Sequence, residues 1–261
     1  RETGMRLSFL YTAIRLTLID LVRNRFLLFL LFFVPGFFYL IAWITNPDTP
    51  TAFRLASVEE EPVISVSQQD LGLVFIGLAA AGLIASFLAL SLMQRNNNEN
   101  KRLILAGFKT QELIAAKFII TVCLISMVAI FIGLMGTILM DPGHFPGMTL
   151  GYILCGFVYG SYGMLVGSVL KRELEGILFI VLLANIDVGW LQNPIYYADA
   201  QNQLIIEYLP AFFPSQVAIA SAFTDYSIRI ATLGSLAYGL LFMLLSFLLF
   251  WINMRISKHT G

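Results

Sequence analysis

Residues 94–117 read QRNNNENKRLILAGFKTQELIAAK and form a polar stretch between two long apolar runs. The stretch carries five of the chain's sixteen Lys and Arg residues, at positions 95, 101, 102, 109 and 117. It also contains a small apolar group, Leu103-Ile104-Leu105, which is followed by a break at Gly107. A loop that needed only to be soluble would not require this group. We therefore predict a folded element to which a partner protein can bind.

The composition of the chain predicts an integral membrane protein. Of its 261 residues, 58% are hydrophobic and 12% are charged, whereas soluble domains are about half apolar and about a quarter charged. Both cysteines, Cys123 and Cys155, lie inside apolar runs and are interpreted as buried small hydrophobes. Residues 1–4 precede Met5 and are expected to be a cloning remnant outside the fold.

Six apolar runs are long enough to cross a bilayer, which takes about 20 helical residues. They cover residues 26–45, 71–93, 118–140, 148–170, 174–193 and 230–252. We therefore predict an all-α integral membrane fold, with residues 5–261 in a single transmembrane domain.

The segment before the first run, residues 5–25, has apolar residues at helical spacing with basic residues among them. Such a segment is typical of an amphipathic helix that lies in the membrane interface. A plain cytosolic flank is the alternative.

The loops differ in their content of Lys and Arg, and this difference predicts the orientation. Fourteen of the sixteen basic residues fall in the terminal segments, in residues 95–117 and at 171–172. The other side holds only Arg54 and Arg229, and its loops are acidic. We therefore expect a multi-pass protein of the plasma (inner) membrane with both termini in the cytoplasm.

Two of the predicted spans carry small residues at helical spacing. They are Gly77, Ala81, Ala85 and Ala89 in the second span, and Gly156, Gly160, Gly163 and Gly167 in the fourth. Small residues let helices approach closely in lipid, so both stripes predict packing faces. The sequence leaves open whether the facing helix belongs to the same chain or to a second copy.

The two long outer loops differ in kind. Residues 194–229 are apolar and aromatic and contain Pro210 and Pro214, which predicts two short half-inserted helices, an outer re-entrant hairpin before the sixth span. Residues 46–70 contain Glu59-Glu60-Glu61 and are expected to form an exposed, solvated loop.

The sequence contains no recognisable nucleotide-binding, metal-binding or catalytic motif. Lys109-Thr110 follows Phe108, where a phosphate-binding loop would need Gly. His144 stands alone in a tight outer turn, and His259 lies in the C-terminal tail, so neither a metal cluster nor a Ser/His/Asp set is suggested. We expect no catalytic residue, no bound metal, no cofactor and no nucleic-acid partner.

One carboxylate, Asp187, stands inside a predicted span, near Asn185 and Trp190. Charges inside a membrane usually face a cavity or a partner. These three residues are candidates for a substrate or ion path. Alternatively, Asp187 reaches the outer interface.

The complete layout resembles the membrane subunit of ABC-2 type (type V) ABC transporters. The resemblance covers the chain from Met5 and is strongest at ENKRLILAGF, residues 99–108, followed by Glu112-Leu113 and Lys117. In that family an acidic residue opens the segment, a Leu-rich turn and a break follow, and a Glu and a Lys open the third span. Here Ala106-Gly107 stands where the family frequently has Pro.

The resemblance implies a cytoplasmic coupling helix between the second and third spans that docks into a separate ATPase subunit. The residues implied in this coupling are Glu99, Arg102, Leu103, Ile104, Leu105, Gly107, Phe108, Lys109 and Glu112. Capping preferences agree: Asn98 can begin this helix, Gly107 can end it, and Thr110 can cap the next one. An ordinary basic loop at the lipid headgroups is the alternative.

The resemblance further implies a permease subunit that pairs with a second permease subunit, identical or different, in contact with membrane lipid. ATP and Mg would bind to the ATPase subunit, so this chain by itself would not be an enzyme. We expect export of a hydrophobic or amphipathic substrate (a drug, lipid or peptide), with Phe212 and Phe213 in an outer gate. The alternatives are an ion-coupled transporter or channel, and a peptide-immunity or sensing role.

Overall fold

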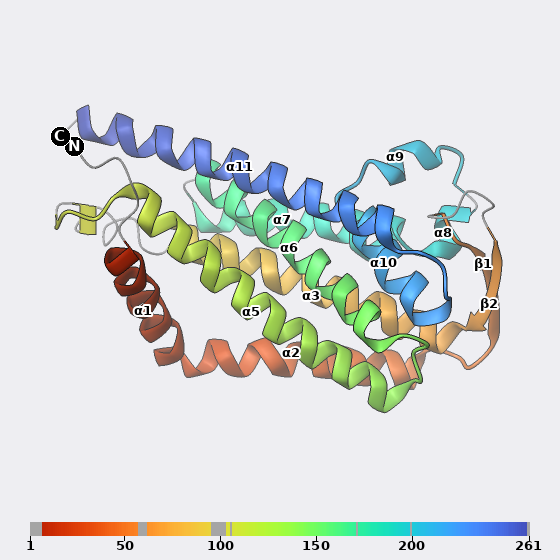
Figure 1. Ribbon diagram of the computed structural model, residues 1–261. Helices are drawn as coiled ribbons and strands as arrows, with labels where there is room; N and C mark the ends of the chain where they lie inside the picture. The colour runs from red at the N-terminus through yellow and green to blue at the C-terminus, as the bar shows by residue number, and fades with distance from the viewer. Residues whose placement is uncertain are drawn as a thin grey trace.

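The computed structural model describes residues 7–56, 62–94, 103–104, 106–170, 172–198 and 200–259. Six helices in these ranges are long and apolar enough to cross a membrane, which agrees with the prediction of a multi-pass, mainly helical membrane protein. They are α2 (Arg25–Thr45), α3 (Gln68–Gln94), α5 (Thr110–Leu139), α6 (Phe145–Val169), α7 (Glu173–Ile186, continued by the π-helical turn η1, Asp187–Leu191) and α11 (Arg229–His259). Figure 1 shows them side by side in one elongated bundle.

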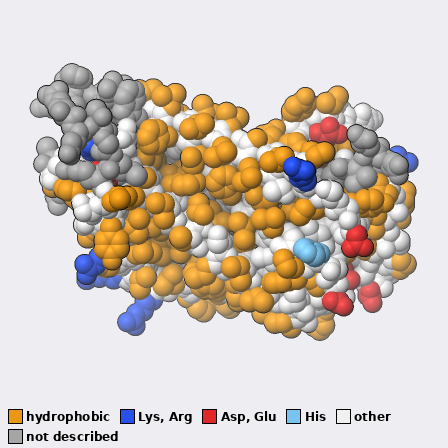
Figure 2. Space-filling model, viewed as in Figure 1, with side chains coloured by type: hydrophobic (Ala, Val, Ile, Leu, Met, Phe, Trp, Pro, Cys, Tyr) orange, Lys and Arg blue, Asp and Glu red, His pale blue; other side chains and the backbone are white. Residues whose placement is uncertain are grey.

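The two ends of the bundle differ in charge (Figure 2). We call one end the basic end: it holds α1 (Leu7–Arg23), residues 103–109 and Arg172. The opposite end, the acidic end, holds a β-hairpin, the α5–α6 turn and the short helices that precede α11. Between the ends the surface is mostly apolar, because α2, α5, α7 and α11 expose large hydrophobic side chains.

Helix α6 occupies the centre of the bundle and packs against α3, α5, α10 (Phe212–Phe223) and α11. The glycine stripe of α6 makes this possible. A methyl group at Gly156 would meet Ile125 of α5, and one at Gly163 would meet the backbone of Ser86 in α3. The small-residue faces predicted from the sequence are therefore packing faces, and their partners belong to the same chain.

The segment expected as a solvated loop contains a β-hairpin instead. Strands β1 (Pro50–Arg54) and β2 (Val63–Ser67) pair antiparallel, with Pro50 opposite Ser67. Phe53 is 2% exposed and Leu55 is 1% exposed. Strand β1 also packs against α8, and the burial of these two side chains in the main core stabilises a pairing too short to persist alone. Glu59, Glu60 and Glu61 lie outside the described residues.

The predicted half-inserted segment contains three short helices: α8 (Pro194–Ala198), α9 (Gln203–Glu207) and α10. Helix α10 is buried along nearly its whole length. Its C-terminal end meets the α5–α6 turn, where Gly143 N–H donates to the Ala222 carbonyl at 2.8 Å and His144 N–H donates to the Ser221 carbonyl at 2.9 Å.

The N-terminal end of α10 lies deeper in the bundle. Ala211, which caps α10, and Tyr159 of α6 both donate a hydrogen bond to the carboxylate of Asp187. Tyr159 is fourteen residues after Phe145, the first residue of α6, which corresponds to about 21 Å along the helix axis. Helix α10 therefore runs from the interior of the bundle back to the acidic end (Figure 1).

Candidate functional site

The polar stretch between α3 and α5 contains a helix end with a defined geometry. Gly107 has a φ of 96°, and its N–H donates to the Ile104 carbonyl at 3.0 Å. Phe108 N–H donates to the Leu103 carbonyl, also at 3.0 Å. This pair of bonds, with a left-handed glycine between them, is a Schellman motif. The prediction that a helix ends at Gly107 is confirmed.

The next helix, α5, begins immediately after this motif. Its N-cap residue is Lys109, so the sequence-based assignment of Thr110 as the cap is wrong by one residue. The carboxylate of Glu112 accepts a hydrogen bond from Lys109 N–H at 2.9 Å, and the Glu112 side chain is fully buried. The carboxylate satisfies a backbone donor that the helix itself cannot, which is why a helix start favours Glu three residues after the cap.

The apolar residues of the stretch pack against α1. Leu103, Ile104 and Phe108 are half-buried against a cluster formed by Leu10 and Ala13 of α1 with Leu113 and Ala116 of α5. The Phe9 and Phe108 rings meet edge to face with centroids 4.7 Å apart. Leu103 and Ile104, the described residues of the apolar group noted in the sequence, therefore contact α1 and are also partly exposed.

Only part of the predicted coupling set lies among the described residues. Leu103, Ile104, Gly107, Phe108, Lys109 and Glu112 are gathered at the basic end, whereas Glu99, Arg102 and Leu105 lie outside the described residues. Ala106 and Gly107 are both exposed.

We define the coupling element as residues 103–113. It continues without interruption into α5, which is 30 residues long and crosses the whole bundle. A continuous α-helix of this length spans about 45 Å. Residues 103–113 are therefore joined to one of the six long apolar helices without an intervening long loop.

Asp187 lies at the junction of α7 and the π-helical turn η1, and its side chain is fully buried. Its carboxylate accepts three hydrogen bonds, from the Tyr159 hydroxyl at 2.6 Å, Gln192 Nε2 at 2.7 Å and Ala211 N–H at 2.8 Å. These donors come from α6, from the residue after η1 and from the start of α10. The carboxylate therefore ties the α8–α10 segment to the centre of the bundle.

Gln192 extends this hydrogen-bond network. Its amide nitrogen also lies 3.3 Å from the Ile206 carbonyl, and its amide oxygen accepts a 3.4 Å bond from Ser215 of α10. Gln192 and Ser215 are both buried. Buried polar groups that are all paired hold one arrangement of the surrounding helices, because any alternative leaves them unpaired.

The other two residues predicted for a path lie elsewhere. The Asn185 amide donates to the Val181 carbonyl of its own helix and is exposed. Trp190 is 54% exposed and meets Tyr196 edge to face. Asp187 points instead into the bundle, so the three side chains form no common site in this structure.

Phe212 and Phe213, the predicted gate residues, are packed at the N-terminal end of α10. Their rings meet edge to face with centroids 5.3 Å apart. Phe212 is 6% exposed and contacts Tyr197, whereas Phe213 packs where Gly234 of α11 leaves room for its ring. Both side chains hold α10 in place in this conformation.

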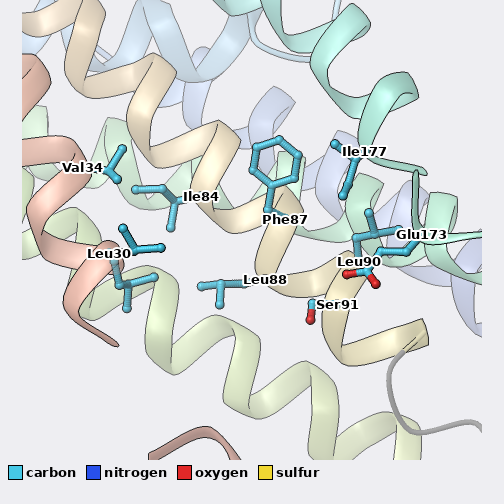
Figure 3. Close-up of a pocket in the computed structure, with 10 residues that line it drawn as sticks. Leu30, Val34, Ile84, Phe87, Leu88, Leu90, Ser91, Glu173 and Ile177 are labelled. Carbon is cyan, nitrogen blue, oxygen red and sulfur yellow. The ribbon is translucent and has the colours of Figure 1, made fainter. Parts of the chain in front are cut away.

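A lateral cavity of about 510 Å³ lies between α2, α3 and α7, toward the basic end (Figure 3). Its walls are almost entirely apolar, and its polar groups are Ser91 of α3 and Glu173 at the start of α7. A volume of this size accommodates a small organic molecule. The cavity was not predicted, because its lining residues come from three helices that are distant in the sequence.

No group of three His, Cys, Asp or Glu side chains in the described part of the chain is placed to hold a metal ion. His144 instead caps α6: its Nδ1 accepts a 3.1 Å hydrogen bond from Gly147 N–H. This bond gives the solitary histidine a local structural role.

Sequence reasoning identified Asp187 but missed its partners Tyr159, Gln192 and Ala211. Gln192 resembles other polar residues near span ends, and Tyr159 is one of three tyrosines inside the predicted fourth span. The Ala211 donor is a backbone group with no sequence signal at all. No protein-family model matches the chain, and no curated protein matches it at a significant level.

Proposed function

We propose that the chain is the permease subunit of an ATP-driven exporter of the ABC-2 type, without an ATPase domain of its own. In this proposal a separate ATPase subunit binds ATP and Mg and docks at the basic end. A second permease subunit, identical or different, completes the translocation path. The cargo is a hydrophobic or amphipathic compound.

The observation that supports this proposal most directly is the coupling element. Its Schellman motif and the Glu112 cap hold it rigidly, and it is continuous with α5. An ordinary loop at the headgroups would need neither a buried carboxylate at the helix start nor a packed apolar cluster. A rigid element is what a subunit needs to convert movement of a partner into movement of a helix.

The arrangement of α1 agrees with an interfacial helix on the cytoplasmic side. One face of α1 is buried through Leu10 and Ala13, while Leu7, Tyr11 and Val22 expose apolar side chains beside basic residues. Figure 1 shows α1 inclined across the end of the bundle. Exposed apolar groups beside Arg suit the boundary between headgroups and acyl chains. Placing the basic end in the cytoplasm of a plasma (inner) membrane follows the distribution of Lys and Arg.

The α8–α10 segment acts, in this proposal, as a re-entrant hairpin at the outer side. Its helix α10 reaches from the acidic end to the depth of Tyr159, yet it is too short to span. Backbone groups at that depth must be satisfied within the protein. Phe212 and Phe213 then belong to an outer gate that would have to repack when cargo passes.

The coupling assignment is tested by copurifying the chain with candidate ATPase subunits and measuring ATP turnover. Ala106→Asp is the sharpest variant, because Ala106 is exposed and its substitution disturbs an incoming partner more than the fold. We expect loss of ATPase copurification and loss of permease-stimulated turnover. Tyr226→Asp at the acidic end is the matched control and should behave as wild type, since Tyr226 is similarly exposed but lies across the bundle.

The double variant Leu103→Asp with Phe108→Asp removes the apolar group of the coupling element. Because both side chains also pack against α1, its thermal unfolding must be compared with that of wild type. If Ala106→Asp and the double variant both retain ATPase binding and turnover, the coupling assignment is wrong.

A further inference from the structure

We propose that the lateral cavity between α2, α3 and α7 binds lipophilic cations and that Glu173 selects for their positive charge. The inference rests on the proposed function only in naming such a cation as cargo. The binding site itself is inferred from the geometry of the cavity and does not depend on the proposed function.

The walls of the cavity are contributed by aliphatic and aromatic side chains. Leu30 and Val34 come from α2, Ile84 and Phe87 come from α3, and Ile177 comes from α7. Figure 3 shows these side chains around one space. Such walls favour the apolar body of a ligand, because each square ångström of apolar surface removed from water stabilises binding.

Glu173 supplies the charge at one end of this apolar space. It is the first residue of α7, and its carboxylate is directed toward Ser91 on the facing helix α3 (Figure 3). The Ser91 hydroxyl adds a second oxygen that can face a cation. The end of the cavity is therefore polar and acidic, whereas the deeper part is apolar.

The neighbouring charges leave the carboxylate of Glu173 to a ligand. Glu175 forms an ion pair with Arg172, with 3.5 Å between the nitrogen and the oxygen. Among the described residues no ion pair joins Glu173 to a cation of the chain. Among the described charged residues of this turn, Glu173 is the one that lines the cavity, so its carboxylate favours a cation over an anion at this end.

Tight packing between α3 and α7 holds Glu173 in this position. Gly176 has no side chain and lets Leu90 and Gln94 of α3 approach the first turn of α7. The Gln94 amide donates to the Leu170 carbonyl at 2.9 Å, just before that turn. The carboxylate is therefore placed by the backbone of two packed helices and not by a free loop.

The test measures binding of radiolabelled tetraphenylphosphonium to the full chain in dodecyl maltoside micelles by equilibrium dialysis. Tetraphenylborate, which has nearly the same size and shape but a negative charge, is the matched ligand. We expect saturable binding of the phosphonium ion and weaker binding of the borate ion to wild type.

The charge is tested with Glu173→Gln, and Glu175→Gln is the matched control two residues further along α7, outside the cavity lining. Glu173 is exposed, and solvent screens the attraction between its carboxylate and a bound cation. We therefore expect Glu173→Gln to weaken phosphonium binding by only about fivefold. Glu175→Gln should bind as wild type does. Ile84→Trp and Val34→Trp fill the cavity from opposite walls and should abolish binding of both ions while the thermal unfolding of the chain is retained.

Three results would overturn the proposal. One is equal phosphonium affinity in wild type and Glu173→Gln, and another is equal affinity of wild type for the two ions. The third is a copurified phospholipid, seen by native mass spectrometry, that the phosphonium ion does not displace and that Val34→Trp removes. The assay contains no ATPase subunit, so a failure here is distinguishable from a failure of the coupling assignment.

Discussion

The Tyr159 hydroxyl donates a 2.6 Å hydrogen bond to the Asp187 carboxylate, and both side chains are fully buried. The bond joins the centre of α6 to the start of η1, and the same carboxylate oxygen accepts the Ala211 N–H of the α10 cap. An intramembrane acid is often interpreted as part of an ion path. Here its three hydrogen bonds favour a structural role, as the anchor of the α8–α10 segment.

Tyr159→Phe removes one of the three donors to Asp187. We expect the free energy of unfolding to fall by about 1–2 kcal/mol, because a bond to a carboxylate is lost from a buried site. Tyr162→Phe is the matched control, one turn away in α6, because the buried Tyr162 hydroxyl has no hydrogen-bond partner among the described residues. Thermal unfolding in detergent should separate the two variants, and equal Tm shifts would contradict this view of Asp187.

Asp187→Ala leaves the donors of Tyr159, Gln192 and Ala211 without their acceptor. Asp187→Asn keeps one oxygen, so it should lose less stability than Asp187→Ala. A double-mutant cycle that combines Asp187→Asn with Tyr159→Phe should give a coupling energy of about 1–2 kcal/mol. Additive effects of the two substitutions would show that the pair is not coupled.

Gly163→Ala should destabilise the bundle, because the added methyl group would meet the backbone of Ser86 and cannot be relieved by a rotamer change. Overpacking of this kind costs about 1–3 kcal/mol. Gly36→Ala in α2 is the control: no atom lies within 4 Å of the added carbon. That variant should be neutral or slightly more stable, since Ala favours helix more than Gly does. A loss of stability in both variants would indicate a general effect of glycine replacement.

Gly107→Ala tests the conformation of the coupling element without changing its contacts. No atom lies within 4 Å of the added methyl group, but the φ of 96° disfavours any residue with a Cβ. We expect a cost of about 1–2 kcal/mol for retaining this conformation.

The measured consequence of Gly107→Ala should be weaker coupling to ATP turnover in the complex with an ATPase subunit. Gly107→Asn is the comparison, because Asn tolerates the left-handed conformation better than Ala does. Turnover should therefore be higher in Gly107→Asn than in Gly107→Ala. The reverse order would mean that backbone conformation at residue 107 does not control coupling.

The sequence by itself determined the features that depend on local physics. The six apolar runs correspond to six long helices. A run of about 20 apolar residues suits the bilayer core, and the helical conformation satisfies the backbone hydrogen bonds where no water is present. Gly107 ended a helix as predicted, because the left-handed conformation is a property of one residue. Even there the N-cap of α5 is Lys109 and not Thr110, and the side chain that satisfies a backbone donor at this helix start is Glu112, which accepts from Lys109 N–H.

Only the tertiary structure decided which distant residues meet. Asp187 is bonded by Tyr159, 28 residues before it in the sequence, and by Ala211, 24 residues after it. The partners of the glycine stripe and the walls of the lateral cavity likewise come from separate helices. Helix formation uses bonds four residues apart, so the sequence encodes it locally. Burial, by contrast, depends on which helix faces pack together, and that is a property of the whole bundle.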